Sequence, residues 1–166
     1  MNPFPPLTVL FCFTVGLPAA FGAPSGPRSM PSQQQIPAIE KKVGPSADSV
    51  YNEGVALMKA RNYAAARAKF EEAVKLKPSF ADAHNNLAFC LRKQNPANYK
   101  QSLDHYNTAI KLNPKLARAY EYRGVLLVQM NRKADAEKDL ATLKQLDPKL
   151  AAQLDAAIKT GKDTEY

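Results

Sequence analysis

Residues 54–78 read GVALMKARNYAAARAKFEEAVKLKP, and the order of small, large and proline positions in this stretch recurs twice downstream. The closing prolines are Pro78, Pro114 and Pro148, so the intervals between them are 36 and 34 residues. Three of the four prolines beyond residue 45 occupy this position. Repetition at a period of about 34 residues is typical of stacked supersecondary units, which usually present a binding surface rather than a catalytic centre.

The shared register extends well back from each proline. Matching small or large side chains stand five, eight and twelve positions before it: Ala73, Phe70 and Ala66; Ala109, Tyr106 and Ser102; Leu143, Leu140 and Ala136. Gly54 and Gly124 both precede their proline by 24 residues. A glycine inside a helix costs about 1 kcal/mol relative to alanine, so two of them at one position indicate a close approach of helices. We expect Phe70, Tyr106 and Leu140 to fill the space between paired helices.

Caps, breakers and prolines predict seven helices, with the ranges 47–60, 63–77, 80–93, 99–112, 115–130, 132–146 and 149–160. Ser46 is expected to cap the first helix, Ser79 with Asp82 to form a capping box for the third, and Gly161 to end the last. The 36-residue interval is attributed to a longer turn at 94–98. No window alternates apolar and polar residues over several positions, so no strand is predicted.

The motif Gly54…Ala66-x3-Phe70-x2-Ala73-x4-Pro78 resembles the tetratricopeptide repeat, a helix–turn–helix unit of 34 residues. Matching residues recur in the other two copies at the offsets given above, so the resemblance covers residues 47–150. It implies an all-α fold, a right-handed α-solenoid of three repeats over 47–80, 81–116 and 117–150. A capping helix over 149–161 is expected to follow, because Leu150, Leu154 and Ile158 form a one-sided apolar stripe.

Two positions depart from the family pattern. The tryptophan of the first helix is replaced by Val50, His84 and Tyr120 in the three copies. The leucine before the small residue becomes Glu53 in the first copy and Arg123 in the third. These changes affect the expected packing in detail and leave the expected fold unchanged.

The first 22 residues are uncharged and apolar, and they are interpreted as a secretory signal peptide cut after Gly22. The apolar stretch 7–20 is shorter than the roughly 20 residues that a membrane span needs. A cleaved signal, an uncleaved anchor and a start codon assigned too early all remain open. The prediction is an exported protein, periplasmic or secreted, without a stable membrane span after cleavage. Residues 23–46 are rich in Pro, Ser and Gln and are predicted to be a disordered linker.

Charge and chemistry exclude several functions. The net charge is +8, but the basic residues are scattered among acids, which favours a solvated helix surface over a nucleic-acid interface. His84 and Cys90 lie about 240° apart around one helix, so they form no dyad. No metal, phosphate or nucleotide motif occurs. We therefore expect no enzymatic activity and no cofactor, and we expect Cys90 to be a buried thiol.

The family resemblance places a peptide-binding groove on one face of each first helix. By register, thirteen residues would line it: Tyr51, Asn52, Val55, Lys59, Asn85, Asn86, Phe89, Lys93, Arg118, Glu121, Tyr122, Val125 and Gln129. Tyr51, Phe89 and Tyr122 would form an aromatic stripe, unless these rings merely pack on one another. Some family members clamp a chaperone's terminal carboxylate with two lysines, two asparagines and an arginine. Here only Asn86 matches and Arg118 could replace a lysine, so such a clamp is not expected.

The resulting hypothesis is a non-catalytic, exported interaction module that binds a peptide or helix of a partner protein in this groove. One alternative is a structural protein of the cell envelope that self-associates through the ends of the array. Another is a protein that binds acidic cell-wall polymer or lipid headgroups electrostatically. The sequence identifies neither the partner nor the oligomeric state.

Overall fold

The computed structural model describes residues 44–162, and this range is helical throughout, with no strand. The elements are α1 (Ala47–Lys59), α2 (Tyr63–Leu76), α3 (Ala81–Gln94), the 3-10 turn η1 (Pro96–Asn98), α4 (Tyr99–Leu112), α5 (Ala117–Gln129), α6 (Lys133–Leu146) and α7 (Pro148–Thr160). The predicted signal peptide and most of the predicted linker lie outside the described residues. None of the described helices is long and apolar enough to cross a membrane.

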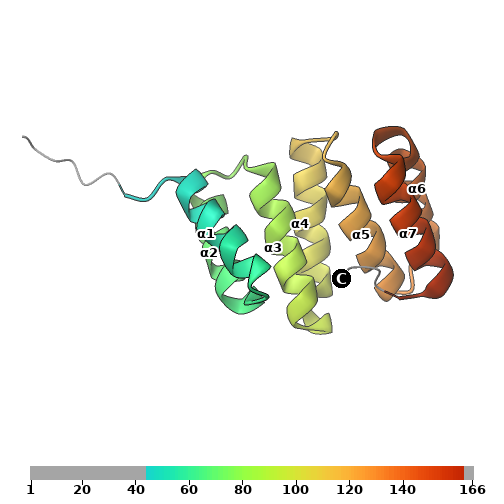
Figure 1. Ribbon diagram of the computed structural model, residues 1–166, viewed down its shortest axis with the longest axis horizontal. Coiled ribbons are helices and arrows are strands. Elements are labelled where there is room, and N and C mark those ends of the chain that lie inside the picture. Colours follow the sequence, from blue (N-terminus) through green and yellow to red (C-terminus); the bar gives the residue numbers. More distant parts are fainter. Residues whose placement is uncertain (1–43, 163–166) are drawn as a thin grey trace, which may run out of the picture. The chain divides into compact units, whose positions relative to one another are not determined.

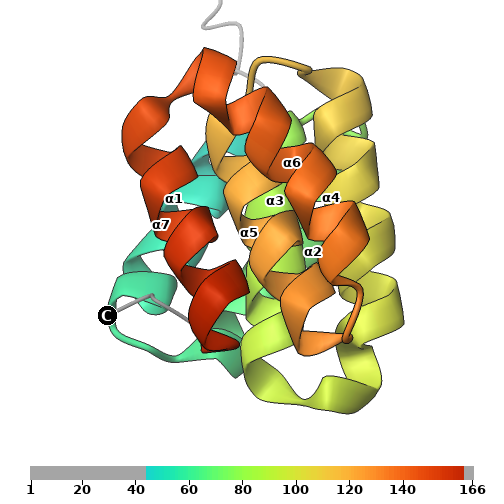
Figure 2. The ribbon, with the colours of Figure 1, turned by 90° about the vertical axis from the view of Figure 1, so that its right-hand side faces the viewer.

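The helices form two layers, with α1, α3, α5 and α7 in one and α2, α4 and α6 in the other (Figures 1 and 2). Successive helices pack as antiparallel hairpins, and each hairpin packs on the next through α2 with α3 and α4 with α5. The last helix, α7, packs against both α5 and α6. It therefore occupies the place that the first helix of a further repeat would take. The predicted all-α solenoid is confirmed.

The turns inside the repeats explain the unequal proline spacing. Arg61 and Asn131 each stand 17 residues before their proline, and both adopt the left-handed conformation with φ of 59°. In the second repeat the 3-10 turn takes the place of this residue, and Asn95 caps it by accepting a hydrogen bond from the Ala97 N–H at 2.8 Å. The predicted longer turn is thus one added turn of 3-10 helix.

Two of the three predicted caps are confirmed. Ser46 Oγ accepts a hydrogen bond from the Ser49 N–H at 3.1 Å, and Gly161 ends α7 with φ of 69°. The capping box of Ser79 with Asp82 is wrong. The helix α3 begins one residue later, with Phe80 at its N-cap and no side-chain cap, because the Phe80 ring packs on Tyr51 with centroids 4.8 Å apart.

Gly54 and Gly124 each leave room for a large side chain, but the two side chains come from different positions in the fold. A Cβ on Gly54 would lie 2.7 Å from the Phe70 ring of the same hairpin. A Cβ on Gly124 would lie 2.5 Å from Leu154, which comes from α7 and not from the hairpin partner α6. Leu140, which was expected to fill this space, packs with Leu154 in the cluster beneath α7. The capping helix therefore completes the third repeat as well as covering it.

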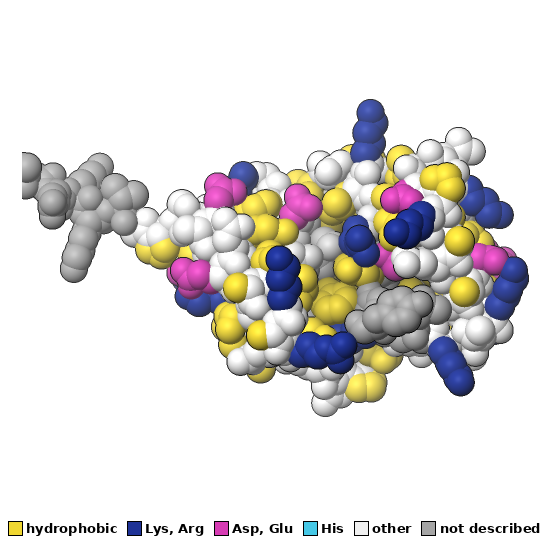
Figure 3. Space-filling model, in the orientation of Figure 1, with side chains coloured by type: hydrophobic (Ala, Val, Ile, Leu, Met, Phe, Trp, Pro, Cys, Tyr) yellow, Lys and Arg dark blue, Asp and Glu magenta, His cyan; other side chains and the backbone are white. Residues whose placement is uncertain are grey.

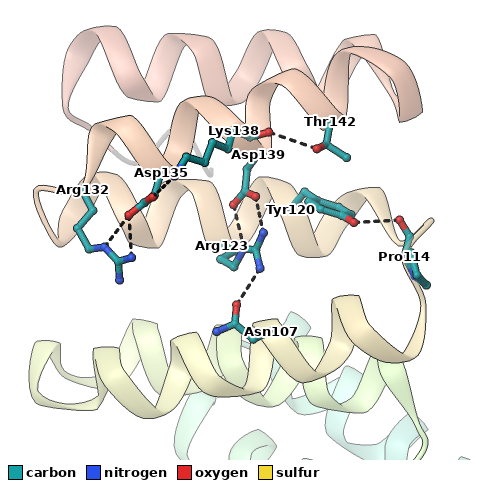
Figure 4. A network of polar contacts seen from close by, with 9 residues as sticks. All are labelled: Asn107, Pro114, Tyr120, Arg123, Arg132, Asp135, Lys138, Asp139 and Thr142. Carbon is teal, nitrogen blue, oxygen red and sulfur yellow. Dashed lines mark hydrogen bonds and ion pairs between the residues drawn. The ribbon is translucent and has the colours of Figure 1, made fainter.

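The two departures from the family leucine carry ion pairs. Glu53 lies 2.6 Å from Lys69 of α2. Arg123 donates to Asp139 of α6 through Nη2 at 2.5 Å and Nε at 3.0 Å, and through Nη1 to Asn107 Oδ1 at 2.7 Å (Figure 4). Burial raises the pKa of the Asp139 carboxyl, and the hydrogen bonds from Arg123 act in the opposite direction. Charges at this position thus stay paired within their own hairpin.

The two histidines of the chain, His84 and His105, meet between α3 and α4. The Nδ1 atoms of His84 and His105 are 3.1 Å apart, and the ring centroids are 5.4 Å apart. His84 Nε2 lies 3.0 Å from the Pro78 carbonyl oxygen, which can only accept, so Nε2 carries a hydrogen. One proton between the two Nδ1 atoms satisfies the neutral pair. If both rings were protonated, two N–H groups would face each other.

Acidification is therefore expected to destabilise the array. Burial and the neighbouring His84 lower the pKa of His105, with Arg67 acting in the same direction and Asp104 and Glu71 in the opposite one. Because the folded pKa lies below the ordinary 6.5, the folded state binds fewer protons than the unfolded chain. The unfolding free energy should fall as the pH drops from about 7 toward about 5.5, the range in which a free histidine becomes charged. Urea midpoints at several pH values measure this.

The matched control for this prediction is His105→Gln, which keeps a polar side chain that does not titrate. The variant should show a smaller decrease in urea midpoint over the same pH range. A decrease of equal size in both proteins would assign the pH dependence to other groups.

Candidate functional site

All thirteen predicted groove residues lie on the layer formed by α1, α3 and α5, but their environments differ. Asn52, Lys59 and Arg118 are exposed, while Tyr51, Val55, Lys93, Tyr122 and Gln129 are half-buried. Asn85, Asn86, Phe89, Glu121 and Val125 are buried. Val125 is 1% exposed and packs with Leu150 and Leu154 of α7, so its side chain belongs to the core.

The predicted aromatic stripe is divided into two groups. Tyr51 packs on Phe70 and Phe80, with centroids 5.6 Å and 4.8 Å away, and so belongs to the packing of the first repeat. Phe89 and Tyr122 pack on each other across α3 and α5, with centroids 4.9 Å apart. The two groups have different neighbours, so only Phe89 and Tyr122 remain candidates for a joint site.

Amide side chains connect α1 to α3. Asn85 Nδ2 donates to Asn86 Oδ1 at 3.1 Å, and Asn86 Nδ2 donates to the Tyr51 hydroxyl at 3.1 Å. Burial raises the pKa of Tyr51, Asp82 adds to this effect, and the Asn86 hydrogen bond opposes it. The Asn86 amide thus has partners within the protein at both ends. It positions Tyr51 and is not held ready for a ligand.

Cations surround the Phe89–Tyr122 pair. The Arg92 guanidinium lies 5.3 Å and the Lys93 ammonium 5.5 Å from the Phe89 ring centre. The Arg118 guanidinium lies 5.6 Å from the Tyr122 ring centre. We call these five residues the cation–aromatic cluster. Such contacts fix the cations over the rings and are worth about 0.5–1 kcal/mol each at exposed sites.

Arg92 is the member of the cluster that the sequence analysis missed. It is 3% exposed, although arginine is rarely buried so completely. Asn85, Phe89 and Arg92 follow the spacing i, i+4, i+7, which places them on one face of α3. That spacing was the available signal, since it adds Arg92 to the same face as two residues already predicted.

Two amide oxygens beside the cluster lack hydrogen-bond partners among the described residues. They are Asn85 Oδ1 on α3 and Gln129 Oε1 on α5, and both atoms are buried. A buried carbonyl oxygen without a donor costs about 1–3 kcal/mol, so native structures seldom leave one unsatisfied. These oxygens are suited to accept N–H groups from an added segment.

Three cations lie on this surface, namely Arg92 and Lys93 of α3 and Arg118 of α5. Arg118 Nη1 lies 3.5 Å from Oε2 of Glu121. Figure 3 shows the same layer of helices, with hydrophobic side chains exposed between lysine and arginine side chains. We call the cation–aromatic cluster together with Asn85 and Gln129 the α3–α5 face. It offers positive charge, aromatic rings and hydrogen-bond acceptors.

Comparison with known proteins identifies the repeats. A family model described as "Tetratricopeptide repeat" matches residues 51–95, and one described as "TPR repeat" matches residues 98–131. The chain is a tetratricopeptide repeat protein. The match confirms the family that the proline register had indicated.

Curated relatives of this tetratricopeptide repeat protein are distant. "Tetratricopeptide repeat protein 36" of Xenopus tropicalis is 32% identical over 111 residues, which cover 64% of this chain and 54% of the relative. "Tetratricopeptide repeat protein 16" of Macaca fascicularis is 29% identical over 103 residues, covering 59% of this chain and 12% of the relative. The chain thus spans about half of one relative and a small part of the other.

A solved structure shows the same fold. The first tetratricopeptide domain of Spaghetti (RPAP3), bound to the HSP90 peptide SRMEEVD, superposes with a TM-score of 0.63 at 20% identity. The match covers 69% of this chain and 90% of that domain. At this level of identity the likeness supports the arrangement of helices.

The described part of this tetratricopeptide repeat protein has no group of three or more His, Cys, Asp or Glu residues placed to hold a metal ion. Cys90 is buried, and burial raises the pKa of its thiol to about 12. A thiol with such a pKa stays protonated near neutral pH and is a poor nucleophile. The predicted burial of Cys90 is confirmed.

Proposed function

We propose that this tetratricopeptide repeat protein is a non-catalytic interaction scaffold whose α3–α5 face binds an extended, acidic segment of a partner protein. The observation that carries the proposal is the cation–aromatic cluster spanning two repeats. It combines Arg92, Lys93 and Arg118 with the rings of Phe89 and Tyr122. Arginine and aromatic side chains are the residue types most enriched where binding energy concentrates.

The charge balance favours an acidic ligand. Arg92, Lys93 and Arg118 place three positive charges around the Phe89–Tyr122 pair, so this surface should attract an acidic segment more strongly than a basic one. Carboxylates form charge-assisted hydrogen bonds with arginine that are roughly twice as strong as neutral ones. Aromatic or aliphatic side chains of the ligand would meet the rings of Phe89 and Tyr122.

The amide oxygens favour an extended ligand. A peptide in extended conformation presents free backbone N–H groups, whereas a helix satisfies its own. Asn85 Oδ1 and Gln129 Oε1 lie on neighbouring helices and are suited to accept two such N–H groups. The surface is therefore better matched to an extended segment than to a helical one.

The structural neighbour offers partial support. The Spaghetti domain was solved with the peptide SRMEEVD, which contains three acidic residues in seven. The carboxylate-clamp positions in this chain hold Tyr51, Val55 and Tyr122, so any acidic peptide would have to be bound by different groups. We further propose that the scaffold acts after export, which the uncharged apolar segment 1–22 supports.

The test is fluorescence anisotropy with two labelled twelve-residue peptides, each containing aromatic residues. One carries several Asp and Glu residues, and its twin has Asn and Gln in their place. We expect the acidic peptide to bind and its twin to bind at least about tenfold more weakly, which is about 1.4 kcal/mol. Lys93→Glu and Arg118→Glu should each weaken binding of the acidic peptide by about the same factor.

The matched control is Lys111→Glu, an equal charge reversal at an exposed position of α4 in the other layer. Lys111→Glu should leave binding of the acidic peptide within about twofold. Equal losses in all three variants would mean that net charge alone attracts acidic polymers, and the α3–α5 face would not be the site. Light scattering of the same samples tests the remaining alternative, a structural protein that self-associates through the ends of the array.

A further inference from the structure

We propose that the α3–α5 face has an occupant within the same chain, the acidic segment 163–166 with the sequence Asp-Thr-Glu-Tyr. This inference rests on the function proposed above, and it makes the scaffold self-inhibited. Partner segments would have to displace the chain's own segment before they bind.

The amino-acid composition of residues 163–166 suits the α3–α5 face better than that of residues 23–43. Residues 163–166 contain Asp163, Glu165 and an aromatic ring, Tyr166, and they contain no base. Residues 23–43 carry three basic residues and one acidic residue, so the cations of the α3–α5 face would repel them. The net charge of the chain is +8, which makes this short acidic and aromatic segment exceptional within it.

The helix arrangement directs the chain toward the face. Successive helices are antiparallel, so α3, α5 and α7 run in the same direction (Figures 1 and 2). Ile158, in the last turn of α7, packs against the cluster that contains Leu127 and Val128 near the end of α5. Arg92 and Lys93 lie in the last turn of α3, so they are at the same end of the layer. The chain therefore leaves α7 at the level of Arg92 and Lys93.

The length of the segment suffices. Two neighbouring helix axes are about 8–10 Å apart, so the path from α7 across α5 to α3 is about 16–20 Å. Residues 161–166 span at most about 20 Å when extended. The left-handed conformation of Gly161, with φ of 69°, turns the chain out of the helix at this point. Glu165 would then meet Arg92 and Lys93 of α3, and Tyr166 would reach Phe89.

A tethered occupant competes strongly even when its intrinsic affinity is low. Short flexible tethers give effective concentrations in the mM range, so a segment that binds with a Kd of about 0.1 mM would occupy the face about 90% of the time. Occupancy of this size raises the apparent Kd of any competing peptide about tenfold. Removing the segment should therefore tighten binding without adding a contact.

The first test places a reporter in the segment. The chain contains no tryptophan, so Tyr166→Trp introduces a single emitter. We expect its emission to be shifted to shorter wavelength and its anisotropy to match that of the folded array. Lys93→Glu, or Asp163→Asn with Glu165→Gln, should return the emission to that of exposed tryptophan, whereas Lys111→Glu should not. Emission typical of exposed tryptophan in the otherwise unchanged chain would overturn the inference.

The second test separates this inference from the proposed function. Removal of residues 163–166 should lower the Kd of the acidic twelve-residue peptide about tenfold, and removal of residues 1–43 should leave it within about twofold. Unchanged binding after removal of 163–166 would refute the self-occupied face while the scaffold function stands. Absence of binding even after removal would refute the scaffold function itself. Tighter binding only after removal of 1–43 would assign the occupant to the amino-terminal region and overturn the inference.

Discussion

Phe70→Ala is expected to lower the unfolding free energy of the array by about 3–5 kcal/mol, the usual cost of removing a fully buried ring. Phe70 has no exposed surface, fits against Gly54 and packs on Tyr51. Among the described helices, those of the first repeat pack on a neighbouring repeat on one side only, so the loss should appear first as melting of α1 and α2. Urea unfolding followed by circular dichroism measures the loss, and hydrogen exchange locates it.

Two controls isolate the packing of the ring. Leu76→Ala removes a large side chain from the same helix, but Leu76 is 49% exposed, so a change within about 0.5 kcal/mol is expected. Gly54→Ala alone should cost about 1–3 kcal/mol, because its Cβ would lie 2.7 Å from the ring. In the Phe70→Ala background that clash disappears, so the two effects should not add. Strict additivity would refute the contact.

Arg123→Ala is expected to cost about 3 kcal/mol, since it leaves the Asp139 carboxylate buried without its cation. Asp139 is 3% exposed and accepts both hydrogen bonds of the pair from Arg123. The arginine also bridges to Asn107 of α4, so its loss should loosen the contact between the second and third repeats. Thermal and urea unfolding measure the change.

The comparison variant is Glu53→Ala, which breaks the corresponding pair with Lys69 in the first repeat. Both of those side chains are substantially exposed, so less than about 1 kcal/mol is expected. The double variant Arg123→Leu with Asp139→Leu should recover most of the loss, because it removes the buried charge together with its partner. If Arg123→Ala and Glu53→Ala cost the same, the burial of Asp139 has no energetic consequence.

The sequence predicted the fold because the same pattern of residues occurs in three copies. The prolines at 78, 114 and 148 defined the helix ends, and the residues at fixed offsets from them turned out to be the buried ones. A family resemblance then supplied the solenoid of three helix–turn–helix repeats with a capping helix. Boundaries were correct to within two residues, which is the usual range of fraying and capping at helix ends.

The site was less predictable, because side-chain partners depend on distances between helices. The repeat register placed Val125 on the surface, but α7 covers it. It gave no sign of the contact between His84 and His105, which come together only when α3 and α4 pack. Arg92 escaped notice because a charged residue was assumed to point toward solvent. Each case depends on contacts between helices, and the spacing of residues within one helix does not reveal such contacts.

The two ion pairs at the family's leucine position have opposite polarity, and this affects how the helices find one another. Repeat proteins risk pairing a helix with the equivalent helix of another repeat. If α1 paired with α6, Glu53 would face Asp139, and if α5 paired with α2, Arg123 would face Lys69. Both mistaken hairpins set like charges together, while both native hairpins set opposite charges together. The opposite polarity of the two pairs thus disfavours these two mistaken hairpins relative to the native ones during folding.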